Sequence, residues 1–122
     1  MKFVDANIIL RYILNDDKKM ADYAEVIIDS GSAFILPEVL AEIVYVLVKV
    51  YKVERSVISM QLISLIQNIQ TSDKSVMENA LKYFAETKLD FVDCILAAYH
   101  STNGEDICTF DKKLNTFISS LC

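Results

Sequence analysis

Apolar and polar residues follow a helical period over most of this chain. The pattern predicts helices at residues 6–14, 18–30, 38–51, 56–69, 75–87, 89–103 and 112–121. Short apolar runs typical of buried strands lie between some of these helices, at residues 3–4, 33–36 and 106–110. Short strands that alternate with helices predict an α/β fold, with a small parallel sheet flanked by helices in one helix-rich domain.

Two residues support the predicted boundaries of these helices. Gly31 follows the second helix, where glycine commonly ends a helix. Pro37 fits the first turn of the next helix, where its missing N–H would have had no helical partner.

The two central helices, residues 38–51 and 56–69, are apolar on nearly all sides. A helix of this kind is either central in a fold or part of an interface. Both faces are hard to bury within so small a domain. We therefore expect this helical pair to carry a protein–protein interface.

Composition excludes several classes of protein. The 122 residues favour one domain, which would be residues 1–122. The three cysteines form no CxxC pair and there is one histidine, so a zinc site is not supported. Two glycines cannot build a phosphate loop or a dinucleotide fingerprint. No apolar run could span a bilayer and no secretory signal begins the chain, so we expect a cytoplasmic protein without a membrane partner.

Four acidic residues occupy unusual positions. Asp5 ends the first strand candidate and Asp111 follows the last, while Glu42 and Asp93 interrupt apolar helices. Ligands of open parallel sheets bind at the carboxyl ends of strands, and a carboxylate in an apolar run needs a partner. Oxygen ligands without Cys or His favour Mg²⁺ or Mn²⁺. The formal net charge of −5 argues against nucleic-acid binding, but less so if these carboxylates converge on a metal ion.

Each acid also has a purely structural interpretation. Asp5 could cap the first helix, and Asp90 could cap the helix that follows it. Glu42 could point outward from its helix, and Asp111 could belong to a surface turn. Each structural explanation is favoured when the residue is considered alone, whereas one metal site explains all four acids more economically.

The motifs together resemble a PIN domain, and within that superfamily the VapC-type toxins. The resemblance covers essentially the whole chain and rests on the runs FVDAN, AE, LDFVDCILAA and TFDKKL, which contain the four acids in order. It implies that Asp5, Glu42, Asp93 and Asp111 are catalytic and hold the metal. Asn7, Asp90 and Thr109 would have auxiliary roles.

The resemblance also implies a Rossmann-like, mostly parallel sheet and one or two Mg²⁺ or Mn²⁺ ions. The expected activity is endonucleolytic cleavage of RNA to 5′-phosphate and 3′-hydroxyl ends. The expected biological role is that of the toxin in a type II toxin–antitoxin pair. The expected partners are therefore the RNA substrate, an antitoxin protein and a second copy of the chain in a homodimer.

Two other functions remain open on the sequence. A Mg²⁺-binding regulatory domain similar to a phosphoacceptor receiver also places acids at strand ends. It would normally have an acidic pair after the first strand, where this chain offers Asp5 alone. A catalytically silent α/β interaction domain is the other alternative, and the intact set of acids argues against it.

Overall fold

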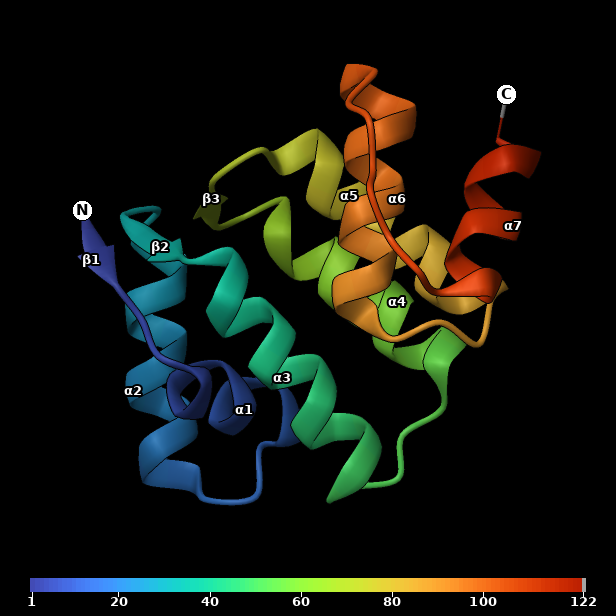
Figure 1. Ribbon diagram of the computed structural model, residues 1–122. Coiled ribbons are helices and arrows are strands. Elements are labelled where there is room, and N and C mark those ends of the chain that lie inside the picture. Colours follow the sequence, from blue (N-terminus) through green and yellow to red (C-terminus); the bar gives the residue numbers. More distant parts are fainter. Residues whose placement is uncertain (122) are drawn as a thin grey trace.

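A computed structural model describes residues 1–121 as a small sheet surrounded by helices (Figure 1). The strands are β1 (Lys2–Phe3), β2 (Ala33–Ile35) and β3 (Gln70–Thr71). The helices are α1 (Ala6–Leu14), α2 (Lys18–Asp29), α3 (Pro37–Lys49), α4 (Arg55–Ile66), α5 (Lys74–Glu86), α6 (Phe91–Asn103) and α7 (Lys112–Ser120). The predicted helix-rich α/β fold with a parallel sheet is confirmed.

The sheet is open and parallel, in the order β1-β2-β3. Phe3 aligns with Phe34, and Ile35 aligns with Thr71 on the other side of β2. The Val4 N–H extends the β1 pairing by donating to the Phe34 carbonyl at 3.0 Å. Because every strand is parallel, the helices that follow β1 and β2 begin at the same edge of the sheet.

Local sequence signals account for several helix ends. Asp5 and Asp17 cap α1 and α2, and each accepts a backbone N–H from three residues ahead at 3.1 Å. Pro37 occupies the first turn of α3, as predicted. Gly31 follows the end of α2 with a φ of +77°, a conformation that most other residues adopt only with strain.

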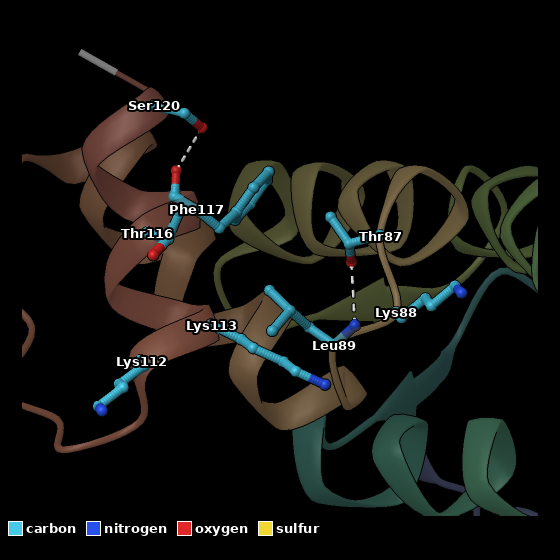
Figure 2. Close-up of a pocket in the computed structure, with 8 residues that line it drawn as sticks. All are labelled: Thr87, Lys88, Leu89, Lys112, Lys113, Thr116, Phe117 and Ser120. Carbon is cyan, nitrogen blue, oxygen red and sulfur yellow. Dashed lines mark hydrogen bonds between the residues drawn. The ribbon is translucent and has the colours of Figure 1, made fainter.

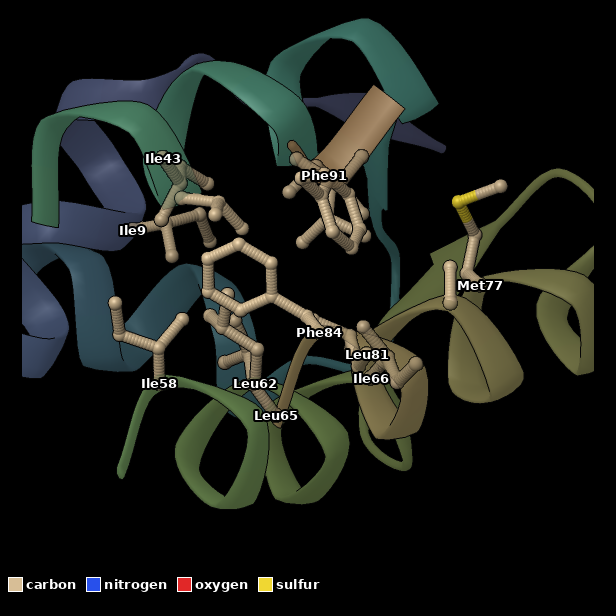
Figure 3. Packing of buried hydrophobic residues seen from close by; sticks show 14 of the residues in the cluster. Ile9, Ile43, Ile58, Leu62, Leu65, Ile66, Met77, Leu81, Phe84 and Phe91 are labelled. Carbon is tan, nitrogen blue, oxygen red and sulfur yellow. The ribbon is translucent and has the colours of Figure 1, made fainter. Parts of the chain in front are cut away.

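The core lies between α3 and the packed layer of α4, α5 and α6. Helix α5 packs on both α4 and α6, while α1 packs on α2 and α3. Figure 3 shows the Phe84 ring among Ile58, Leu62 and Ile43, with Phe91 nearby. The rings of Phe84 and Phe91 meet edge to face, with centroids 5.9 Å apart. Within this layer α6 carries Asp93, and α6 also packs on α7, which Asp111 caps.

Two predictions about strands are wrong. Residues 106–110 form no strand, although they contain a run that favours one. In Figure 1 this segment descends alongside α6 to the start of α7, far from β1 in the view. It has no strand partner there, and the Phe110 side chain is fully exposed. The structure adds β3, whose residues lie between the helices predicted at residues 56–69 and 75–87 and were not predicted as a strand.

The central helices bury more of their apolar surface than we expected. Leu40, Ile43 and Leu47 of α3 are fully buried, as are Ile58 and Leu62 of α4. The core of this small domain therefore accommodates more than one face of each helix. The large apolar side chains still exposed on or next to these helices are Leu36, Tyr45, Val50, Tyr51 and Met60. Among residues 1–121, no helix is long and apolar enough to cross a membrane.

Candidate metal and nuclease site

Asp93 lies in the first turn of α6 and is partly buried. Burial raises the pKa of Asp93, and the negative charges of Asp111 and Asp90 raise it further. Among residues 1–121 the side-chain ion pairs join Arg11 to Asp16 and Lys18 to Asp22, so none of them neutralises this group. Three carboxylates at two helix starts therefore lie near enough for the charges of two of them to raise the pKa of the third, and no ion pair among residues 1–121 joins a cation to them.

A pocket of about 550 Å³ opens beside Asp93, between α3 and the start of α6. Its walls include Asp90 and Asp93, together with Ala41 and Tyr45 of α3. Asp90 occupies the position before α6 but its side chain makes no capping hydrogen bond. The structural explanation of Asp90 as a side-chain cap is therefore wrong, and its carboxylate is available to the pocket.

Arg55 fixes the loop that leads into α6. Its Nε donates to the Phe84 carbonyl at 2.8 Å, and its guanidinium also donates to the Leu89 carbonyl. The same guanidinium lies over the Phe84 ring, 3.6 Å from the centroid. Desolvation lowers the pKa of Arg55, and the charge of Asp90 opposes this effect. Sequence analysis missed this positioning residue, whose only signal was an arginine at the start of an apolar helix.

Asp111 begins α7 and is oriented by local hydrogen bonds. Its carboxylate accepts the Leu114 N–H at 2.9 Å, which caps the helix. Its own N–H donates to the Thr109 hydroxyl at 3.0 Å, while the Asn115 amide donates to the Thr109 carbonyl at 2.9 Å. Thr109 therefore orients the backbone of Asp111.

Asp5, Asn7 and Glu42 are exposed on the sheet side of the molecule. Asp5 caps α1 through one carboxylate oxygen, which confirms the interpretation of Asp5 as a helix cap. Asn7 shares with Asp5 a surface depression of about 410 Å³ that begins along β1. Glu42 points outward from α3, one residue after the Ala41 that lines the Asp93 pocket.

The predicted four-acid cluster is not assembled. Among residues 1–121, no three His, Cys, Asp or Glu side chains lie close enough together to hold a metal ion. The charges of Asp111 and Asp90 contribute to the raised pKa of Asp93. The chemistry of the donors nevertheless fits Mg²⁺, which is commonly bound by one or two carboxylates, several waters and substrate phosphates.

Comparison with known families identifies the chain at the level of its domain. A family model described as the PIN domain matches residues 2–117. A search of curated proteins and a search of solved structures each found no match. PIN domains are generally nucleases that use divalent metal ions such as Mg²⁺, and PIN nucleases act on RNA. The matched region includes all four predicted acids and the open parallel sheet, and the chain belongs to the PIN domain family.

Proposed function

We propose that this protein is a Mg²⁺- or Mn²⁺-dependent endoribonuclease that acts in the cytoplasm as the toxin of a type II toxin–antitoxin pair. The observation that carries the nuclease proposal is the environment of Asp93. Its carboxylate is partly buried, the like charges of Asp111 and Asp90 raise its pKa further, and it has no ion-pair partner among residues 1–121. Such a cluster favours a divalent cation, because a cation relieves both the repulsion and the desolvation of the carboxylates.

In this proposal Asp93 and Asp111 are the principal metal ligands, and Asp90 assists them. Thr109 orients Asp111, and Arg55 holds the loop from which Asp90 and Asp93 project. A divalent ion bound here would polarise the scissile phosphate and activate water for attack. We retain Asp5 and Glu42 as proposed ligands, with Asn7 beside Asp5, and variants of each decide whether they serve the same ion.

The antitoxin and homodimer proposals rest on apolar side chains that the core leaves exposed. Tyr45 and Val92 are both more than half exposed, and both line the pocket that contains Asp93. An antitoxin segment bound over them would cover the proposed catalytic acids. We assign a second contact surface to Val50, at the C-terminal end of α3, and to Met60, in the middle of α4. Mass measurement with and without a candidate antitoxin tests both proposals.

The test of the nuclease proposal is cleavage of mixed RNA in Mg²⁺ by the wild-type protein, Asp93→Asn and the control Asp106→Asn. Asp106 is exposed, and its substitution by asparagine removes the same charge as Asp93→Asn. All three proteins are purified identically and assayed with and without a chelator. We expect the wild type and Asp106→Asn to cleave in Mg²⁺, and Asp93→Asn and every chelated sample to be inactive.

Equal cleavage by the wild type and Asp93→Asn would contradict the proposal, because a contaminating nuclease would give that result. An inactive wild type would favour the catalytically silent interaction domain instead.

A cellular test follows the same logic: induction of the wild type should arrest bacterial growth, whereas induction of Asp93→Asn should not. Growth arrest by both proteins would remove the link between the nuclease and toxicity.

A further inference from the structure

A second cleft lies between residues 87–89, in the loop before α6, and α7. It has a volume of about 450 Å³. Figure 2 shows residues 87–89 on one side and α7 on the other, with Leu89 and Phe117 forming apolar walls. Phe117 is held by an edge-to-face contact with Tyr83, with ring centroids 5.1 Å apart. The cleft therefore contains an anchored aromatic ring on a mainly apolar surface.

Three lysines surround this cleft. Lys88 precedes Leu89 in the loop, and Lys112 and Lys113 begin α7 directly after Asp111. All three are exposed, and in Figure 2 Lys113 extends between α7 and residues 87–89, whereas Lys88 and Lys112 extend outward on opposite sides of the cleft. The protein as a whole has 12 basic and 17 acidic residues. A site rimmed by three cations is therefore a local departure from an acidic surface.

We propose that this cleft binds single-stranded RNA, with one unstacked base against Phe117 and the flanking phosphates on Lys88, Lys112 and Lys113. Sites for single strands combine basic residues that neutralise the backbone with aromatic rings that receive bases. This cleft offers both, together with the volume expected of a small-ligand site. Asp90 in the loop before α6 and Asp111 at the start of α7 would repel the RNA phosphates. Only the three lysines are therefore complementary to phosphate here.

The inference rests on the proposed ribonuclease function and deepens it. Asp111 and Lys112 are consecutive, and Lys88 precedes Asp90 by two residues. RNA held by the lysines would therefore pass the start of α6, where Asp93 interacts with Asp111. The cleft would hold the strand while the acids act on a neighbouring phosphate. A duplex should bind poorly, because its bases stay stacked and cannot enter the cleft.

The chain provides a matched control for the lysine pair on α7. Lys18 and Lys19 begin α2 after Asp17, just as Lys112 and Lys113 begin α7 after Asp111, and both aspartates cap their helices. The test compares Lys112→Gln/Lys113→Gln with Lys18→Gln/Lys19→Gln. Each variant loses the same charge at an equivalent helix position. Binding of a labelled single-stranded oligoribonucleotide is measured by anisotropy, in chelator, at several salt concentrations.

Each phosphate contact in a single strand contributes about 0.7 to the slope of log affinity against log salt. Loss of two contacts should reduce that slope by about 1.4 and weaken binding about 25-fold at 0.1 M salt. The control pair should change neither value appreciably. Phe117→Leu should weaken binding at least fivefold without changing the slope, because stacking is not ionic. Melting temperatures are recorded for each variant, so that loss of folding is distinguished from loss of binding.

Equal binding by both lysine pairs would overturn the inference, as would a duplex that binds as tightly as the single strand. RNA cleavage in Mg²⁺ is measured on the same proteins, which separates this inference from the proposed function. If the wild type cleaves RNA but the α7 pair has no effect on binding, the inference fails and the nuclease stands. If the α7 pair controls binding but no protein cleaves, the binding site stands and the nuclease fails.

Discussion

Asp5 and Asp93 are two of the four predicted catalytic acids, and their surroundings in the structure differ. Asp5 is exposed and accepts the Ile8 N–H, so helix capping accounts for it without any chemistry. Asp93 is partly buried, has no ion-pair partner and interacts with two other carboxylates. The comparison teaches that an aspartate at the start of a helix carries little functional information until its structural role is known. Asp93 therefore carries the nuclease proposal, and Asp5 needs a test that separates capping from metal binding.

The largest expected effect belongs to Asp93→Asn. Loss of a metal ligand removes several kcal/mol of transition-state stabilisation, so RNA cleavage should fall about 10²- to 10³-fold. Stability in chelator should change in the opposite direction. The raised pKa of Asp93 means that folding disfavours its charged form, and the neutral amide removes that cost at pH 7. We expect a higher melting temperature with lower activity, and a lower melting temperature would contradict this account of Asp93.

Arg55→Met should have the largest effect on stability. The variant loses the donors to the Phe84 and Leu89 carbonyls and the contact with the Phe84 ring. Charged hydrogen bonds and a cation–π contact predict a loss of about 2–4 kcal/mol in the free energy of unfolding. The control is Arg11→Met, which breaks a more exposed pair with Asp16 and should cost about 1 kcal/mol or less.

Denaturant titration of both arginine variants measures this difference. Equal losses would show that Arg55 does not fix the loop before α6. A loss of cleavage by Arg55→Met at temperatures where it remains folded would support its positioning role.

Substitutions at Asp5 separate its two possible roles. Asp5→Ala should cost about 1 kcal/mol of stability, because the cap is lost, whereas Asp5→Asn should keep the cap and the stability. If Asp5 is also a metal ligand, both variants should lose at least tenfold in RNA cleavage. Melting temperature and cleavage rate are measured together. Full activity of Asp5→Asn would reduce Asp5 to a cap and confine the site to α6 and α7.

The smallest expected effect belongs to Thr109→Val, which keeps the shape of the side chain and removes its hydroxyl. The Asp111 N–H then loses its acceptor at 3.0 Å. A neutral hydrogen bond of this kind contributes about 0.5–1.5 kcal/mol, and Asp111 should become less well oriented. We expect a slight loss of stability with a decrease of a few-fold in cleavage at limiting Mg²⁺ that excess Mg²⁺ restores. No dependence on Mg²⁺ would assign Thr109 a structural role only.

Periodicity predicted the helices well because each has apolar positions that the core buries. Residues 6–14 were predicted as a helix, and α1 has the same bounds. The strands were harder to predict. β3 consists of Gln70 and Thr71, two polar residues with no apolar signal. Residues 106–110 contain such a signal but gain no strand partner, because strand formation depends on where the rest of the chain lies.

The sequence located the candidate acids but not their tertiary relation. Asp93 and Asp111 are predicted to act together, and the charge of Asp111 contributes to the raised pKa of Asp93. Asp5 and Asp111 could face one crevice at the sheet edge only if residues 106–110 formed a strand next to the first one, and these residues form no strand. The role of Arg55 depends on contacts with Phe84 and Leu89, which lie 29 and 34 residues away in sequence. No local pattern encodes such contacts.

The central claim is that Asp93 and Asp111 hold one divalent ion. Calorimetric titration of Mn²⁺ into the wild type, Asp93→Asn, Asp111→Asn and the double variant tests it most directly, with Asp106→Asn as the control. The account predicts that each single variant loses at least tenfold in affinity, and that the double variant binds no more weakly than the weaker single variant. It also predicts that Asp106→Asn binds like the wild type. Wild-type affinity in Asp93→Asn would contradict the claim.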